Sequence, residues 1–196
     1  MLCIYLTLNA MNLLTTIFPN TKYSMIYISY LGIFDGKNYE DANTPNQIGT
    51  ALNAGYTCMV NVWRSDNKLY VGTENNQIEV SEVSLQGPRY IINAMNSEMQ
   101  TWLPTQYYEL YPNYFWFPNI LENTPVTTSG GQLITPGSVA INNTSIIFLP
   151  ENTDRGLLST VKLRCYGVIS TYLSFIRRMR NEGRSEEHTS ELQSRE

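Results

Sequence analysis

Residues 55–74 have the layout of a small site: a strand, a tight polar turn and a second short strand. Met59 and Asn61 share one face of the first strand, because side chains along a strand repeat with a period of two. Thr73 and Glu74 follow at the end of the second strand. A site built on this stretch would have its floor at Met59 and Asn61 and its lip at Thr73 and Glu74.

The chemistry that these four residues offer is limited. The thioether of Met59 is soft and is a poor ligand for Ca²⁺ or Mg²⁺, whereas Asn61 can offer one carbonyl oxygen. Thr73 does not titrate in a useful range. Glu74 is a candidate to hold a cation, although a carboxylate in a loop is more often simply solvated. The set predicts, at most, a weak site for a hard cation or a polar ligand.

Other residues are candidates for ligand contact or for structural roles. Trp63 and Trp116 could form a stacking wall for a sugar or a headgroup, with packing in the core or at its rim as the competing interpretation. Cys58 lies on the opposite strand face and is expected to be buried and inert, since a thiol needs activation to act as a nucleophile. Asp35 and Asn38 are expected to cap backbone groups of a loop.

Length and composition indicate one globular domain. The chain has 196 residues and a mass of 22.4 kDa, with 42% hydrophobic and 15% charged residues. Disordered chains are instead highly charged and poor in aromatic residues, and a chain of this size can bury a substantial core. The net charge of −4 and the isoelectric point near 5.1 argue against a nucleic-acid partner, which requires a basic surface.

The cysteine pattern favours a reducing compartment such as the cytoplasm. Cys3, Cys58 and Cys165 are odd in number and far apart, so they match neither a disulfide framework nor a metal-binding motif. Residues 1–24 are apolar but lack the basic start of a signal peptide. Secretion is the alternative if this segment acts as a signal. No stable membrane insertion is expected, because asparagines interrupt the apolar run.

Both ends of the sequence look foreign to the fold. Residues 184–196 resemble the one-frame translation of a common sequencing-adapter DNA, with a natural acidic tail as the alternative. This segment holds His188, the only histidine of the chain. We therefore expect residues 1–24 to form an apolar extension outside the fold, residues 25–183 to form the domain, and residues 184–196 to be a disordered, artefactual tail.

The pattern of apolar residues predicts an alternation of strands and helices. One helix is predicted to begin after the capping residue Thr44 and to end at Gly55. A second is expected over residues 96–103, ending before Pro104, and a third over residues 171–180. Strands are predicted at 25–30, 57–63, 68–72, 89–93, 114–117, 132–135, 145–149 and 163–169.

Strands separated by helices or long connections indicate a mostly parallel α/β sheet. Seven main strands plus the hairpin arm at 68–72 are predicted, and a complete eight-fold barrel usually takes about 250 residues. We therefore predict a compact or incomplete (β/α) barrel of the TIM type. A doubly wound open sheet is the alternative, but no glycine-rich phosphate loop follows the first strand.

Several segments resemble those of a known family. They are ISYLGIFDGKN (28–38), YTCMVNVW (56–63), KLYVGTE (68–74), IINAMN (91–96), NYFWFPN (113–119), TTSGGQLITPG (127–137), SIIFLPE (145–151) and GVIST (167–171). In order and spacing the chain resembles the compact TIM-barrel phosphodiesterases akin to glycerophosphodiester phosphodiesterases and phosphatidylinositol-type phospholipases C. The likeness runs from Met25 to Ile176 and implies the barrel fold of that family.

The resemblance also implies that the family's functional positions carry other residues here. The family's His-Arg-Gly after the first strand reads Tyr30-Leu31-Gly32, and its metal-binding Glu-x-Asp reads Met59-Val60-Asn61. Its Gly-His-Asp reads Gly72-Thr73-Glu74. Met95 stands in place of a lysine, and Phe117 in place of a histidine that follows a Phe-Trp pair.

These substitutions remove the groups on which the family's reaction depends. That reaction needs imidazoles as general base and general acid and a divalent cation held by carboxylates. We therefore expect a catalytically silent relative without a cofactor, which binds a small phosphorylated or polyol ligand at the barrel mouth. The alternatives are an active phosphoric diester hydrolase using Tyr30, Asn61 and Glu74 with Ca²⁺ or Mg²⁺, and a non-functional chimeric reading frame.

Overall fold

The computed structural model describes residues 25–85, 87, 89–107, 115–118, 125–129, 131–136, 145–149 and 165–178. The expected extension at 1–24 and the expected tail at 184–196 lie outside these ranges. The strands are β1 (Ile26–Tyr30), β2 (Thr57–Ser65), β3 (Lys68–Thr73), β4 (Asn76–Val80), β5 (Tyr90–Ala94), β6 (Phe115–Pro118), β7 (Val126–Thr127), β8 (Leu133–Pro136), β9 (Ser145–Leu149) and β10 (Gly167–Ser170). The helical segments are α2 (Pro45–Asn53), α3 (Ser97–Tyr107), the 3-10 turns η1 (Tyr39–Asp41) and η2 (Glu82–Leu85), and residues 173–178.

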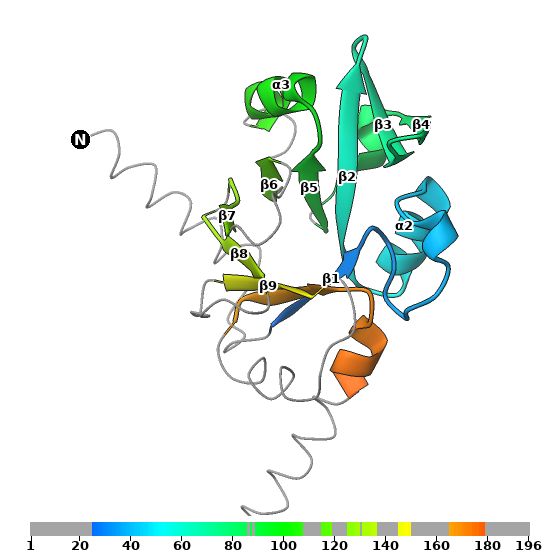
Figure 1. Cartoon of the computed structure of the whole chain (residues 1–196), viewed down its shortest axis with the longest axis vertical. Coiled ribbons are helices and arrows are strands. Elements are labelled where there is room, and N and C mark those ends of the chain that lie inside the picture. Colours follow the sequence, from blue (N-terminus) through cyan, green and yellow to red (C-terminus); the bar gives the residue numbers. More distant parts are fainter. Residues whose placement is uncertain are drawn as a thin grey trace, which may run out of the picture.

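All ten strands belong to one mixed sheet (Figure 1). Its parallel part runs, from neighbour to neighbour, through β8, β9, β10, β1, β2, β5 and β6. Antiparallel pairs extend it from β2 through β3 to β4, and from β8 to β7. The fold is therefore α/β with few helices. The sheet is not closed, because no strand pairing within the described residues joins β6 to β7 or β8.

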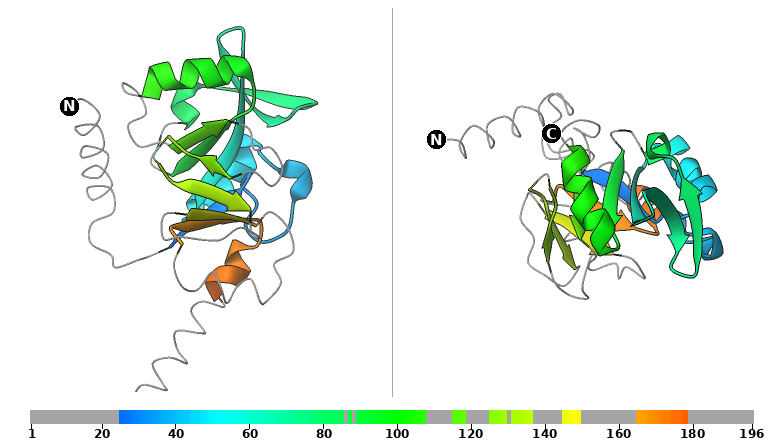
Figure 2. Two further views of the ribbon diagram at one scale, coloured as in Figure 1. Left: turned by 60° about the vertical axis from the view of Figure 1, so that its left-hand side comes forward. Right: turned by 90° about the horizontal axis from the view of Figure 1, so that it is seen from above.

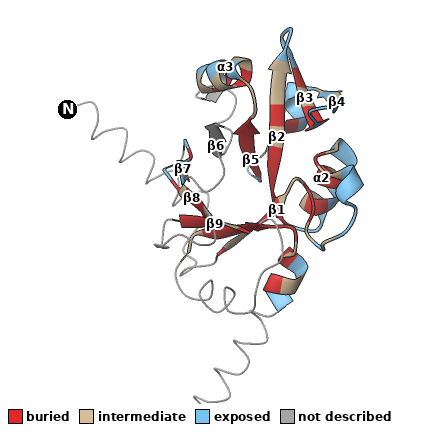
Figure 3. Ribbon diagram, viewed as in Figure 1, coloured by how far each residue is buried: buried red, intermediate tan, exposed pale blue. Residues whose placement is uncertain are grey.

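One face of the parallel strands carries an apolar cluster that is built by strands alone. Its buried members come from six strands, and each is at most 2% exposed. They are Ile28, Met59, Ile91, Ile134, Ile146 and Ile169. Figure 3 shows the central strands in the colour of buried residues. We refer to these six residues as the interior cluster.

Helices pack on the opposite face of the strands. Val60 of β2 shares a cluster with Ile48 of α2 and Leu103 of α3, and Leu173 shares another with Val168 of β10. In Figure 2, as in Figure 1, α3 lies beyond the end of β5, and residues 173–178 lie at the other end of the fold. Among the described helices, none is long and apolar enough to cross a membrane.

The predicted beginning and end of the first helix are confirmed. The backbone N–H of Gln47 donates to Thr44 Oγ1 at 3.3 Å, which caps the amino end of α2. Gly55, with a φ of 86°, follows the helix as predicted. The Gln47 side chain does not complete a capping box, because its Nε2 donates to the Gly32 carbonyl at 3.1 Å. This bond ties α2 to the turn after β1.

The prediction that the second helix ends before Pro104 is wrong. Pro104 lies inside α3, where proline removes one backbone hydrogen bond at a cost of about 3 kcal/mol. Met99 and Leu103 of the same helix are at most 1% exposed in the core. Asn96 caps its amino end by accepting the Met99 N–H at 3.1 Å. Burial and capping therefore keep the helix intact through the proline.

Sequence patterns missed two strands and misplaced the ends of others. β4 was expected to be part of a polar connection, since its NQIEV sequence is mostly exposed. It forms because it pairs with β3, with an ion pair of 2.7 Å between Lys68 and Glu79. β7 has only two residues and gives no sequence pattern. The strand predicted at 163–169 is described from Gly167, and the helix predicted at 171–180 is described from 173 to 178.

A buried asparagine joins β2 to the hairpin beside it. Asn43 is fully buried and has a φ of 61°. Its Nδ2 donates to the carbonyls of Asn61 at 2.7 Å and of Gly72 at 2.9 Å. Its Oδ1 accepts the Asn61 N–H at 3.0 Å. Since β1 leaves the β1–β2 ladder after Tyr30, the Asn43 amide satisfies the backbone groups that β1 no longer reaches.

We predict that Asn43→Ala lowers the free energy of unfolding by about 3 kcal/mol, because it leaves buried backbone groups of β2 and β3 without partners. Asn43→Gly tolerates the positive φ and should be almost as destabilising, which separates the lost hydrogen bonds from backbone strain. Urea unfolding measures both effects. Asn46→Ala, on the exposed side of α2, is the control. Equal midpoints for Asn43→Ala and Asn46→Ala would contradict this role.

Candidate functional site

Two asparagines lie side by side where the parallel strands end. Asn61 of β2 and Asn93 of β5 are register partners in a parallel pair. The Nδ2 of Asn93 donates to Asn61 Oδ1 at 2.8 Å. In parallel sheets the carboxyl ends of the strands meet at one edge, where ligands are usually bound. We call Asn61 and Asn93 the amide pair, and this edge the mouth.

The residues beneath the amide pair belong to the core. Met59 and Ile91 precede the pair by two positions on the same strands, so their side chains point to the same face. Both belong to the interior cluster, and they are 2% and 0% exposed. Met59 therefore fills apolar space at a position where the resemblance implies a metal ligand.

Tyr30 and Leu31, which stand where the resemblance implies a histidine and an arginine, also have structural roles. The Tyr30 ring makes an edge-to-face contact with Phe148, with centroids 5.3 Å apart, and packs against the interior cluster. Leu31 has a φ of 55°, and its N–H donates to the Met59 carbonyl at 2.9 Å. These two residues form the turn that ends β1, and neither offers a group that exchanges protons near neutral pH.

The predicted lip of the site makes no described hydrogen bond to its predicted floor. Thr73 and Glu74 are exposed and lie at the turn between β3 and β4, where Thr73 pairs with Asn76. Within the described residues, Glu74 makes no hydrogen bond or ion pair with Asn61. The residue of this segment that does come near Asn61 is Gly72, through the Asn43 amide. The unpredicted strand β4 makes residue 74 part of a hairpin turn, and the role of Glu74 at the lip stays a prediction.

The remaining predicted positions neighbour the amide pair along β2 and β5 or in the register of β6. Trp63 is half-buried and follows Asn61 by two positions on β2. Met95 accepts a hydrogen bond at its Sδ from Asn93 Nδ2, at 3.1 Å. Phe117 is the register partner of Asn93, and Trp116 that of Ile92. The side chains of β6 lie outside what the structure describes, so the stacking wall of Trp63 and Trp116 stays a prediction.

The loop after β1 confirms one capping prediction and not the other. Asp35 Oδ1 accepts the Lys37 N–H at 3.2 Å, as expected of a loop aspartate. Asn38 precedes η1 with a φ of 56°, but its side chain makes no capping hydrogen bond. Its contribution is to adopt the left-handed backbone conformation, which asparagine tolerates better than most residues.

Cys58 is buried on the face opposite Met59, as predicted. It is 0% exposed and belongs to the cluster under α2. Its Sγ lies 2.9 Å from Ser29 Oγ. Burial raises the pKa of the Cys58 thiol to about 11, against smaller lowering effects of Ser29 and Arg89. A thiol in this environment stays protonated and is not a nucleophile at neutral pH.

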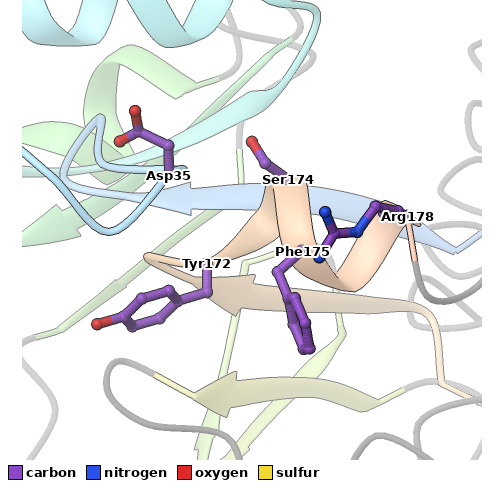
Figure 4. A pocket seen from close by; sticks show the side chains of 5 residues that line it. All are labelled: Asp35, Tyr172, Ser174, Phe175 and Arg178. Atoms are coloured by element: carbon purple, nitrogen blue, oxygen red, sulfur yellow. The ribbon is translucent and has the colours of Figure 1, made fainter.

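A pocket of about 230 Å³ lies between the loop after β1 and residues 173–178. Figure 4 shows its lining side chains, which include a carboxylate, a guanidinium and two aromatic rings. They belong to Asp35, Tyr172, Ser174, Phe175 and Arg178. None of them belongs to the amide pair or to the predicted site residues around it. The pocket is therefore distinct from the amide pair, and its lining residues follow the carboxyl ends of β1 and β10.

No described group matches a metal centre. Where the chain is described, no three His, Cys, Asp or Glu side chains are grouped so that they could hold a metal ion. Comparisons with protein-family models, with curated proteins and with solved structures find no match to this chain.

Sequence reasoning missed the two asparagines that complete this geometry. Asn93 alternates with Ile91 on a predicted strand, so pairing that strand with β2 would have placed it beside Asn61. Asn43 gave no such signal, because its partners lie 18 and 29 positions along the chain.

We predict that Met59→Glu, which restores the acid implied by the resemblance, lowers the free energy of unfolding by about 3 kcal/mol at neutral pH, because it buries an unpaired charge. Burial raises the pKa of such a carboxyl group, so the loss should shrink as the pH falls toward its ordinary value of about 4.3. Met59→Leu conserves volume and should cost less than about 1.5 kcal/mol. Urea unfolding at neutral pH and near the ordinary glutamate pKa of about 4.3 measures these losses. A Met59→Glu variant as stable as the wild type at neutral pH would contradict the packing role.

We also predict a pH dependence from Cys58. Its pKa is higher in the folded state than its ordinary value of 9.0, so the stability it contributes is full below that value and is lost as the pH rises toward about 11. The loss is about 1.4 kcal/mol per pH unit at most. When the pH is raised from below to above 9.0, the free energy of unfolding of the wild type should therefore fall more than that of Cys58→Ala. Parallel pH profiles of the urea midpoint would contradict this.

Proposed function

We propose that this protein is a catalytically silent relative of the glycerophosphodiester phosphodiesterases, which binds a small phosphorylated or polyol ligand at the mouth of an incomplete barrel. The main observation that supports this proposal is the position of the amide pair, which lies at the carboxyl ends of parallel strands directly above the interior cluster. This is the usual location of a ligand site in such folds, and here it consists of groups that bind but do not titrate.

Strand order supports an incomplete barrel. From β1 through β2, β5 and β6, and from β8 through β9 and β10 back to β1, the parallel strands follow chain order. That is the order of a (β/α) barrel, with an opening between β6 and β8.

The interior cluster supports the same arrangement. Its members are buried although no helix residue belongs to the cluster. In a flat sheet, Ile91 of β5 and Ile134 of β8 would be separated by five strand spacings, or about 24 Å. A curved sheet explains how both belong to one buried cluster, since curvature brings the strands around a common interior.

The residue types at the mouth support binding without catalysis. General acid–base catalysis requires a group whose pKa lies near the working pH, and amides do not titrate in that range. The alternative of an active hydrolase uses Tyr30, Asn61 and Glu74, and of these three residues only Asn61 lies in the amide pair. Tyr30 packs on Phe148, and Glu74 is exposed in a turn.

The absence of catalysis is tested by a phosphodiesterase assay on the purified full-length protein. We expect no turnover of glycerophosphocholine above the buffer rate with Ca²⁺ or Mg²⁺, because the amide pair can neither take nor give a proton near neutral pH. Chelator should change nothing, and Glu74→Ala should behave as wild type. Chelator-sensitive turnover that Glu74→Ala abolishes would overturn the proposal in favour of the active hydrolase.

The test of binding uses nitrogen–proton correlation NMR on the same protein, with glycerol 3-phosphate and myo-inositol as probes. We expect at least one probe to shift the side-chain amide signals of Asn61 and Asn93. Asn46, exposed on α2, provides the control signal.

Cooperative urea unfolding of the same protein is also expected, and its absence would favour the chimeric reading frame.

A further inference from the structure

The amide pair contains one acceptor without a partner. Asn93 is 4% exposed. Its Oδ1 is buried and has no hydrogen bond, whereas its Nδ2 has two acceptors, Asn61 Oδ1 at 2.8 Å and Met95 Sδ at 3.1 Å. Most buried polar atoms of folded proteins are hydrogen-bonded, and an exception calls for an explanation such as a bound molecule.

The two bonds of Nδ2 determine which end of the Asn93 amide stays open. A rotated amide would set its oxygen against Asn61 Oδ1 and the Met95 sulfur, which are both acceptors. The observed orientation is therefore the favourable one. Asn61 is only partly buried, and its Nδ2 donates to no described residue. The pair thus presents one acceptor, Asn93 Oδ1, and one donor, Asn61 Nδ2.

The surroundings of the pair are apolar or neutral. Met59 and Ile91 lie below it, and Trp63 follows on the same strand. The nearest basic side chain along β2 is Arg64, which points to the other strand face and is bonded to Glu98. A guanidinium held in this way does not turn toward the pair to neutralise an anion.

We propose that the amide pair binds a hydroxyl group of an uncharged polyol. The hydroxyl donates to Asn93 Oδ1 and accepts from Asn61 Nδ2, which uses both of its hydrogen-bonding roles. This inference rests on the proposed function. It narrows the proposed ligand from a phosphorylated compound or a polyol to a polyol. A phosphate dianion has only acceptor oxygens, so it repels Asn93 Oδ1 and finds no cation at the pair. An ammonium group has only donors and leaves Asn61 Nδ2 unused.

A ligand reaches Asn93 Oδ1 only when a neighbouring side chain moves. Met95 contacts the pair, is half-buried and has an unbranched side chain that adapts readily. A single bound water is the competing explanation for the open acceptor, because water also donates and accepts.

The experiment is an NMR titration of the full-length protein with myo-inositol, methyl phosphate and methylammonium, which carry hydroxyls only, a phosphate only and an N–H ammonium only, followed at the side-chain amides of Asn61 and Asn93. We expect myo-inositol to bind most tightly of the three. Asn93→Leu should weaken its binding by about tenfold, the effect of losing one good hydrogen bond. Asn93→Leu should still fold, because an apolar group of similar shape replaces a polar group that is incompletely bonded.

Further variants make the outcomes distinct. Asn61→Leu should weaken myo-inositol binding to a similar degree, and the control Asn46→Ala should leave it unchanged. Tighter binding of methyl phosphate at the same two asparagines would overturn the hydroxyl assignment while leaving the proposed function intact, and tighter binding of methylammonium would overturn both. Failure of all three probes to shift these signals at millimolar concentration would overturn both, and would leave a bound water as the partner of Asn93 Oδ1.

Discussion

The burial of one strand face by other strands is the constraint on which the structure depends. The interior cluster takes one large apolar side chain from each of six strands, and five of the six are isoleucines. A β-branched side chain suits a crowded strand face, because it loses little rotamer freedom there. Since no helix residue shares this cluster, the position of each strand depends on the others, and the cluster also fixes how far the apolar interior extends toward the mouth.

The transition from apolar to polar occurs within two residues along neighbouring strands. Met59 and Ile91 end the interior, and Asn61 and Asn93 follow with side chains that bond to each other. Pairing the amides limits the cost of placing polar groups next to an apolar core. Asn43 adds rigidity, because its amide holds both backbone groups of Asn61. The position of the pair is therefore fixed by bonds within the protein.

The parts of the fold that sequence could predict are those with a local signal. Thr44, Gly55 and the apolar run at 145–149 carry their own capping or strand-forming signal, and the structure agrees with each of them. Helix α3 continues through Pro104 and β4 forms from polar residues because distant partners stabilise them. The site follows the same rule. The face of Asn61 followed from strand periodicity, whereas its neighbours Asn43 and Asn93 depend on register between strands.

Asparagine at the mouth has a further structural consequence. Two carboxylates at the distance of the amide pair would repel each other, and one of them would have to take up a proton or both would need a cation. Two amides at the same distance attract, because one donates to the other. The mouth of this fold therefore keeps its shape without an ion to hold it together. The amides that cannot transfer a proton therefore also hold the two strand ends together.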